Sequence, residues 1–180
     1  FINWTNAANV EVSTSSTYVP AKVNGFNLAT TYTANFAANT YTVNFVANTG
    51  AGTATQTQSF TYDVAQKLAT NTYAYEGYTF TGWHTDSQAT TALYEDKAEV
   101  SKLTTQENGT VTLYAIWQEN GNVTITYKSA DDTKGTVSTS CEAVAPVTGV
   151  ATGSTAKANP GYHFINWTNA ANVEVSTSST

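Results

Sequence analysis

Short runs in which apolar and polar residues alternate are the dominant pattern along this chain. The runs "YTVNF" (41–45), "VTLYAIW" (111–117) and "VTITY" (123–127) place aromatic or branched side chains at every second position. Successive side chains of a β-strand point to opposite faces, so a period of two residues indicates half-buried strands. The pattern therefore predicts a strand-rich protein.

Between residues 41 and 121 the alternation predicts four or five strands. The expected strands cover residues 41–47, 55–62, 78–84, 93–95 and 111–117. Side chains that share the inward face of the first two strands should enter the core, namely Tyr41, Val43, Phe45, Ala47, Phe60 and Tyr62. The Gly-rich residues 48–53 (NTGAGT) predict a turn between these two strands.

Two stretches of the same region leave room for helix. Residues 64–75 (VAQKLATNTYAY) fit either a short helix or an irregular crossing, and residues 97–103 (KAEVSKL) fit a helical turn. The fold class that we predict is therefore mostly β, of the α+β type, with little helix.

One stretch of the chain occurs twice without a single difference. "FINWTNAANVEVSTSST" forms residues 1–17 and again residues 164–180, which gives a period of 163 residues (164 − 1). Propensity and patterning tolerate many substitutions, so identity over this length indicates a repeated coding unit. We expect the chain to be a window of a longer tandem array.

A weaker repeat lies inside this unit. "GYTFTGW" (77–83) matches "GYHFINW" (161–167) in its Gly, Tyr, Phe and Trp positions, and the strand patterns at 41–45 and 111–117 correspond to those at 123–127 and 30–36. We therefore predict two diverged domains of about 80 residues each, which is within the usual range for a small domain. Domain A spans 41–121, residues 122–180 carry the first part of domain B, and residues 1–40 carry the second part of a preceding B.

Large aromatic residues should supply most of each core, because a small domain buries a limited share of its surface. In domain A these are Phe45, Phe60, Tyr78, Phe80, Trp83, Tyr114 and Trp117, and in domain B they are Tyr32, Phe36, Tyr127, Tyr162, Phe164 and Trp167. Gly77 and Gly161 precede the aromatic strand of each domain, where we expect a turn or a close approach, and Pro160 stiffens the second turn.

The order "YTVNF…TG…Q-FTYD-AQKL…GYTFTGWHT…NGTVTLYAIW" resembles the Listeria–Bacteroides repeat, the internalin B-repeat type of domain found in bacterial surface proteins. Domain B keeps "GYHFINW" and is similar to a divergent member, with Asn166 where domain A has Gly82 and without the "AQ-L" segment. The resemblance implies a small β-grasp-like domain that repeats along the stalk of a cell-surface protein. It implies no enzymatic activity.

The low content of charged residues excludes some classes of binding partner. Charged residues make up 11% of the chain, all seven basic residues are lysines, and the net charge is −6. Binding to nucleic acid or to an anionic membrane surface needs clustered positive charge, so we expect neither partner. Domain A has three lysines and eight acids (3 − 8 = −5), whereas a composite B unit (122–180 with 18–40) has four of each. An array would thus alternate acidic and neutral modules, which discourages lateral clumping.

Residues with catalytic potential are few. His84 lies two positions before Asp86, but no serine or cysteine nucleophile accompanies the pair, and His163 belongs to the other domain. Both histidines are interpreted as solvated strand-end or turn residues. Cys141 is expected to be a small buried or half-buried residue, with a reactive or intermolecular thiol as the alternative. We expect no catalytic, cofactor or metal site.

Two acidic clusters and one possible cross-link complete the candidate chemistry. Asp131 and Asp132 are interpreted as part of a hairpin turn, and Glu95, Asp96 and Glu99 as a solvated face, with weak calcium binding as the alternative. An internal isopeptide bond would need a Lys, an Asn and a buried acid, and only Lys128, Asn35 and Glu142 have suitable rough placement in B.

Taken together, these patterns favour a non-enzymatic structural stalk or spacer of an extracellular, adhesin-like bacterial surface fibre. Neighbouring copies of the repeat are the expected partners, and they would complete the split domain B head to tail between chains. The alternative is a weak glycan- or host-protein-binding module that acts by multivalency, with exposed Trp and Tyr rings as the binding platform.

Overall fold

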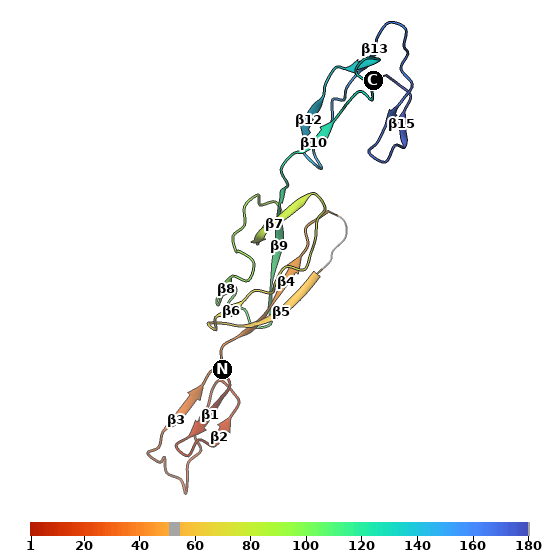
Figure 1. Ribbon diagram of the computed structural model, residues 1–180. Helices are drawn as coiled ribbons and strands as arrows, with labels where there is room; N and C mark the ends of the chain where they lie inside the picture. Colours follow the sequence, from red (N-terminus) through yellow and green to blue (C-terminus); the bar gives the residue numbers. More distant parts are fainter. Residues whose placement is uncertain (51–54, 180) are drawn as a thin grey trace. The chain divides into compact units, whose positions relative to one another are not determined.

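The computed structural model describes residues 1–50 and 55–179. Over these residues the regular secondary structure consists of short strands without any helix (Figure 1). Contacts divide the chain into two compact units, residues 1–72 with 82–115 and residues 73–81 with 116–180. The turn expected at 48–53 falls largely on residues 51–54, which lie outside the described part. The mostly β fold class is confirmed, while the predicted domain boundaries stay a prediction.

The largest sheet has four strands in the order β5-β4-β9-β7. Its members are β4 (Thr40–Val46), β5 (Thr55–Thr61), β7 (Tyr78–His84) and β9 (Gly109–Glu119). Strand β4 pairs antiparallel with β5 and parallel with β9, so it is hydrogen-bonded along both edges. Each of these strands overlaps one that the alternating pattern predicts.

One face of β4 supplies the centre of the core, as expected. Tyr41, Val43, Phe45 and Ala47 are all buried, while the residues between them are half-buried. The Phe45 ring meets the Trp83 indole edge to face at 4.9 Å between centroids, and Tyr41 stacks on Phe60 at 5.6 Å. Such aromatic pairs add to the burial of apolar surface, so this face holds the sheet together.

The contribution of β9 to this core differs from the expectation. Leu113 and Ala115 are fully buried, whereas Tyr114 is half-buried because alternation places it on the opposite face. Tyr62 and Trp117 are likewise half-buried rather than buried.

The two stretches that were compatible with a helix, residues 64–75 and 97–103, form extended structure. Strand β6 (Gln66–Lys67) pairs antiparallel with β8 (Glu99–Val100), so the irregular crossing is confirmed and the helical turn at 97–103 is wrong. Leu68 and Val100, which lie beside or within this strand pair, are both buried. Burial of their apolar surface favours the paired strands over a helical turn that packs against nothing. The expected strand at 93–95 is reduced to an isolated bridge between Trp83 and Tyr94. A β-grasp-like arrangement stays a prediction.

The N-terminal residues form a small three-stranded sheet in the order β2-β1-β3. The strands are β1 (Asn3–Asn6), β2 (Glu11–Ser13) and β3 (Tyr32–Asn35). A row of ring contacts lines the sheet and joins Phe36, Phe1, Trp4, Tyr18 and Tyr32. Phe36 at the end of this row remains largely exposed, so this sheet covers only part of its aromatic surface.

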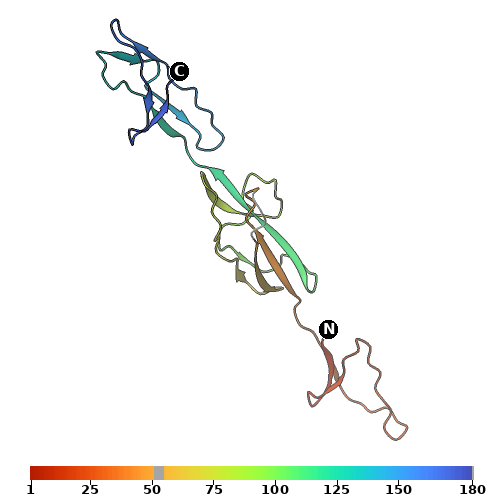
Figure 2. The ribbon, with the colours of Figure 1, turned by 90° about the vertical axis from the view of Figure 1, so that its right-hand side faces the viewer.

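Residues 122–179, cyan to blue in Figure 2, form three two-stranded sheets. They are β10 (Val123–Thr126) with β12 (Cys141–Val144), β11 (Gly135–Val137) with β13 (Ala156–Ala158), and β14 (Trp167–Thr168) with β15 (Glu174–Ser176). Ser154 is the one buried residue among those described here, at 7% exposure. Tyr127, Phe164 and Trp167 are half-buried and Tyr162 is exposed, so the expected B core is not closed.

Candidate functional site

The two identical sequence copies fold into the same hairpin. In the first, Trp4 lies opposite Ser13 and Thr5 opposite Glu11. In the second, Trp167 lies opposite Ser176 and Thr168 opposite Glu174, with the same irregularity in register. The hairpin therefore depends on its own residues rather than on its surroundings.

Three local contacts recur in both copies and explain this autonomy. The amide of Asn3 donates to Glu11 Oε2 at 2.6 Å, and that of Asn166 donates to Glu174 Oε2 at 2.7 Å. The Asn6 side-chain oxygen accepts the backbone N–H groups of residues 8 and 10, a turn that Asn169 repeats with residues 171 and 173. Asn9 and its counterpart both adopt φ 58°, a left-handed conformation that asparagine tolerates.

The surroundings of the two hairpins differ on one edge. Strand β1 pairs along its second edge with β3, where Trp4 lies opposite Ala34. Strand β14 belongs to a two-stranded sheet and pairs with β15 alone among the described strands. The edge of β14 that corresponds to the β1–β3 contact is thus open.

Two further edges in the described residues are open in a related way. Strand β3 is terminal in its sheet, and β10 pairs with β12 alone, whereas the equivalent β4 is paired on both sides. An unpaired strand edge presents N–H and C=O groups that can pair with another chain. The edges of β3, β10 and β14, called the open edges below, form the candidate interaction site.

A cavity of about 450 Å³ lies within residues 122–180. Its lining includes Lys128 just after β10 and Trp167 on β14, together with Val137 and Phe164. The strands that border the cavity are β11, β13 and β14, and aromatic and apolar side chains are part of its lining.

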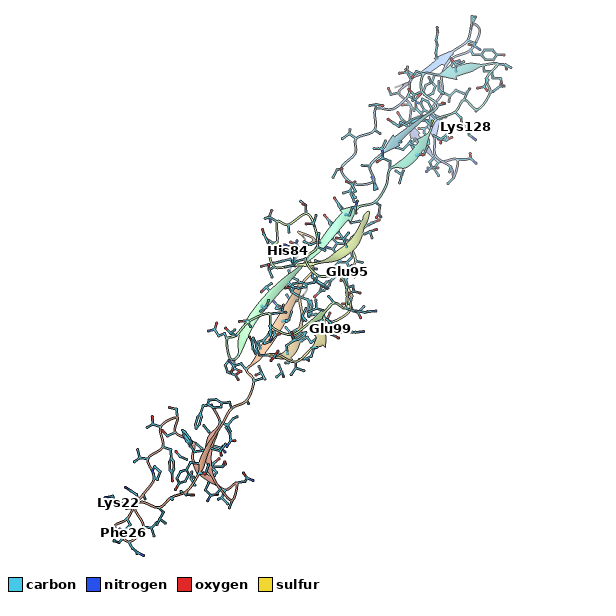
Figure 3. The ribbon with its side chains drawn as sticks, turned by 90° about the vertical axis from the view of Figure 1, so that its left-hand side faces the viewer. Lys22, Phe26, His84, Glu95, Glu99 and Lys128 are labelled. Atoms are coloured by element: carbon cyan, nitrogen blue, oxygen red, sulfur yellow. The ribbon has the colours of Figure 1, made fainter. Side chains whose placement is uncertain are left out.

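The sequence candidates for catalysis do not form a catalytic arrangement. His84 Nδ1 accepts the backbone N–H of Asp86 at 2.9 Å, and the Asp86 carboxylate instead accepts the N–H of Gln88. The pair therefore closes a turn, in line with the solvated-turn interpretation. His163 is exposed in the other unit. Figure 3 shows that His84, Glu95 and Glu99 project at separate places.

The acidic clusters serve local hydrogen bonding. Asp131 accepts the hydroxyl of Thr133 at 2.6 Å and its N–H at 3.0 Å, and it pairs with the Lys134 ammonium at 2.9 Å. These donors lower the pKa of Asp131 to about 2, so this carboxylate closes the expected turn. Asp96 accepts the N–H of Asn71. The described residues hold no group of three side chains suited to a metal ion.

Glu142 is the most heavily hydrogen-bonded acid of residues 122–180. Its carboxylate accepts the Tyr127 hydroxyl at 2.5 Å, the hydroxyl and N–H of Thr152 at 2.7 and 2.8 Å, and the N–H of Gly153 at 3.1 Å. These donors lower the pKa of Glu142 to about 2 and the carboxylate raises the pKa of Tyr127. Glu142 thus ties the loop at 152–153 to the β10–β12 pair.

Two sequence expectations are affected by this arrangement. Cys141 is exposed, so its expected burial is wrong, because alternation along β12 turns Glu142 and Val144 inward and leaves Cys141 outside. Of the three residues considered for an isopeptide bond, Glu142 is occupied by hydroxyl and amide donors. Asn35 bonds to Asn3 and Thr5 in the other unit, and the isopeptide idea stays untested.

Glu119 joins the end of β9 to the loop at 146–148. Its carboxylate accepts the N–H groups of Val147 at 2.7 Å and Thr148 at 2.9 Å, and the Thr148 hydroxyl at 2.6 Å. These donors lower the pKa of Glu119. Sequence reasoning missed this contact, because a single acid at a strand end has no distinguishing pattern.

The expected close approach at Gly77 is observed at the same place. Gly77 has φ +79°, and a Cβ at this position would lie 2.3 Å from Val147 Cγ2. Gly161 also has a positive φ, of +88°, but has open space around it, so its role is confined to the turn. No helix among the described residues is long and apolar enough to cross a membrane.

Comparison with protein families assigns two segments of the chain. Residues 41–116 match the Listeria-Bacteroides repeat domain, and residues 122–180 match the divergent InlB B-repeat domain. The chain carries these two repeat domains in tandem. They are repeat domains of bacterial surface proteins, as the sequence resemblance implied. No curated protein and no solved structure gives a match to the chain.

Proposed function

We propose that this chain is a non-enzymatic spacer section of the stalk of an extracellular, adhesin-like bacterial surface protein. The observation that carries the proposal is exact repetition, since one 17-residue sequence forms the same hairpin twice, once before the first matched repeat domain and once within the second. An array of such units projects other parts of the protein by geometry alone. Each unit of 163 residues adds to its length.

The linker between the matched domains supports a mechanical role. Glu119 lies between the two matched segments, 41–116 and 122–180, and its three hydrogen bonds tie the linker to the following domain. Gly77 allows the close approach of Val147 at the same place. All these contacts lie inside one compact unit, residues 73–81 with 116–180, so they hold the linker to the domain that follows it.

We further propose that neighbouring copies of the repeat are the partners of this segment and complete domain B head to tail. The open edges of β3, β10 and β14 support this proposal, because they leave the B core unclosed. In a continuous array the same pairing would take place between successive units of one polypeptide.

The stalk proposal is tested with arrays of one, two and four 163-residue units. Small-angle X-ray scattering should show a maximum dimension that rises in proportion to the number of units. A dimension that rises only as the cube root of mass would show compact packing of the units and would contradict the proposal.

Weak glycan binding is the second candidate function. An aromatic cluster of half-buried side chains favours it, in which Tyr75 stacks on Tyr78 at 4.2 Å and Trp117 meets Tyr75 and Phe80 edge on. Aromatic rings with one accessible face can stack on sugars. Repetition of weak binding sites along an array raises their overall avidity. Saturable glycan binding that Trp117→Ala abolishes would support this function, and absence of binding by a four-unit array would exclude it.

A further inference from the structure

We propose that Asn120 and Gly121 form a self-modifying site, at which the backbone nitrogen of Gly121 attacks the side-chain amide of Asn120. The product is aspartate or isoaspartate at position 120. The site lies between the two matched segments, 41–116 and 122–180, and the inference does not depend on the stalk role.

The sequence "QENG" occurs twice in the chain, at 106–109 and at 118–121. Identical residues on the N-terminal side give the two Asn–Gly pairs closely similar local chemistry, so a large difference in reactivity has to come from the fold. The glutamate of each copy accepts backbone N–H groups from a neighbouring segment. The two copies differ at the asparagine and the glycine.

Backbone hydrogen bonds hold the first copy in place. The N–H of Asn108 donates to the Thr40 carbonyl oxygen at 2.8 Å. The N–H of Gly109 donates to the Gln106 carbonyl oxygen at 3.1 Å. Gly109 also begins β9, where it lies opposite Tyr41 of β4. The Gly109 nitrogen can therefore attack its neighbour only after this part of the sheet has opened.

The glycine of the second copy has no such constraint. Gly121 follows the end of β9 and is exposed, and nothing lies within 4 Å of the place that a Cβ would take. No hydrogen bond within the described part of the chain involves its N–H group. Solvent base can therefore remove the amide proton, and the peptide can turn toward the side chain of Asn120.

The side chain of Asn120 is positioned by the end of β7. Its Oδ1 accepts the hydroxyl of Thr79 at 2.6 Å, and its backbone N–H donates to the Gly77 carbonyl oxygen at 2.8 Å. These residues and Gly121 belong to one compact unit. A donor on Oδ1 stabilises the negative charge that this oxygen takes up when the amide carbon is attacked. The Thr79 hydroxyl therefore assists the reaction.

The reaction consumes one water molecule and releases one ammonia molecule. The deprotonated nitrogen of Gly121 forms a bond to Cγ of Asn120. The bond from Cγ to Nδ2 then breaks, and the leaving nitrogen takes up a proton and departs as ammonia. Water opens the resulting cyclic imide. Opening at Cγ gives aspartate, and opening at the main-chain carbonyl carbon gives isoaspartate, in which the chain runs through the former side chain.

Either product changes the linker between the matched segments. A carboxylate at position 120 takes the net charge of the chain from −6 to −7 (−6 − 1) and lies next to Glu119. Isoaspartate also lengthens the main chain by one methylene group. Each linker of this kind in an array would thus gain negative charge with age.

Incubation of the full chain in mildly alkaline buffer tests the site. Cleavage after lysine releases residues 103–128, a single peptide that contains both copies of "QENG". Tandem mass spectrometry measures modification at Asn108 and Asn120 in this peptide, and electron-transfer fragmentation separates isoaspartate from aspartate. Asn120 should react at least about tenfold faster than Asn108, whose reaction must first break backbone hydrogen bonds.

Three controls separate the fold from local chemistry. In the urea-unfolded chain the two asparagines should react at similar rates. Gly121→Ala meets no neighbouring atom and should slow Asn120 by roughly tenfold, because a Cβ hinders approach of the nitrogen. Thr79→Val keeps the shape of an exposed side chain without its hydroxyl and should slow Asn120 by roughly threefold or more.

Equal rates at Asn108 and Asn120 in the folded chain, or a faster reaction at Asn108, would overturn the proposal. An intact Asn120 after a period in which the unfolded chain has reacted at both positions would overturn it as well. An unchanged or higher rate in Thr79→Val would overturn the role of the Thr79 hydroxyl.

Discussion

Tyr127 and Glu142 are joined by a hydrogen bond across the β10–β12 pair, in which the phenol hydroxyl donates to Glu142 Oε1 at 2.5 Å. The same carboxylate holds Thr152 and Gly153. One side chain thus organises both a strand pair and a loop in residues 122–180, where few side chains are buried. Its charged form is the form that these contacts require.

The first prediction concerns acid stability of residues 122–180. The folded pKa of Glu142 is about 2, below its ordinary value of 4.5. A lowered folded pKa stabilises the fold fully above the ordinary value, and this stabilisation is lost as the pH falls from about 4.5 toward 2. Glu142→Gln should reduce stability at neutral pH and flatten its decline in this range, measured by urea unfolding at several pH values.

A matched variant separates the charge from the phenol contact. Tyr127→Phe removes one donor and leaves the three contacts from Thr152 and Gly153. It should lose less stability than Glu142→Gln and keep only part of the acid dependence, because the Tyr127 hydroxyl is the largest single cause of the lowered pKa of Glu142. Unchanged acid dependence in Glu142→Gln would contradict the assignment to this carboxylate.

The second prediction concerns the linker contact of Glu119. Glu119→Gln weakens the charge-assisted hydrogen bonds to Val147 and Thr148, whose amides should then exchange with solvent faster. Amides of β4 and β9 at the buried core should keep their protection. Hydrogen exchange followed by NMR checks both statements, with Glu95→Gln as a control at an exposed acid. Unchanged exchange at Val147 and Thr148 would show that the contact is absent in solution.

The third prediction concerns the core of domain A. Phe45 is fully buried against Trp83, so Phe45→Ala should cost about 3–5 kcal/mol of unfolding free energy. Leu93→Ala removes an exposed side chain of the same domain and should cost far less. Urea denaturation followed by tryptophan fluorescence compares the two, and similar losses would contradict the assignment of the core to the inner face of β4.

The fourth prediction concerns Gly82. It has φ +142°, and a Cβ there would lie 2.3 Å from the Tyr94 carbonyl oxygen and 2.7 Å from Ala92 Cβ. Gly82→Ala should therefore destabilise domain A by roughly 1–3 kcal/mol through backbone strain and the clash. Gly121→Ala is the control, because nothing lies within 4 Å of that position. Thermal unfolding of both variants measures the difference, and equal melting temperatures would contradict the structure at Gly82.

Sequence reasoning was most successful where one strand face is buried. The alternation at 41–47 identified Tyr41, Val43, Phe45 and Ala47 because a buried face requires apolar side chains at every second position. It placed Tyr114 in the core because large aromatic rings were favoured over the smaller Leu113 and Ala115, which the register puts inside. It placed a helical turn at 97–103 because two-residue strands are too short to show alternation.

The contacts of Glu119 and Glu142 were beyond the reach of the sequence pattern. Both acids bind backbone N–H groups that become neighbours only after the chain has folded, with separations of 10 to 29 residues. The repeated hairpin is the opposite case. The contacts that recur in both copies span at most nine residues, as between Trp4 and Ser13, so the same letters specify the same structure in both copies.

Sedimentation velocity under reducing conditions tests completion of domain B between copies most directly. The 19.2 kDa chain is compared with a chain that carries a second copy of residues 18–40 after Thr180, which supplies a β3 strand to β10 and β14 within one polypeptide. Pairing of the open edges predicts that the original chain grows in mass with concentration while the extended chain remains a monomer. Two chains that both remain monomeric, or that both associate alike, would contradict it.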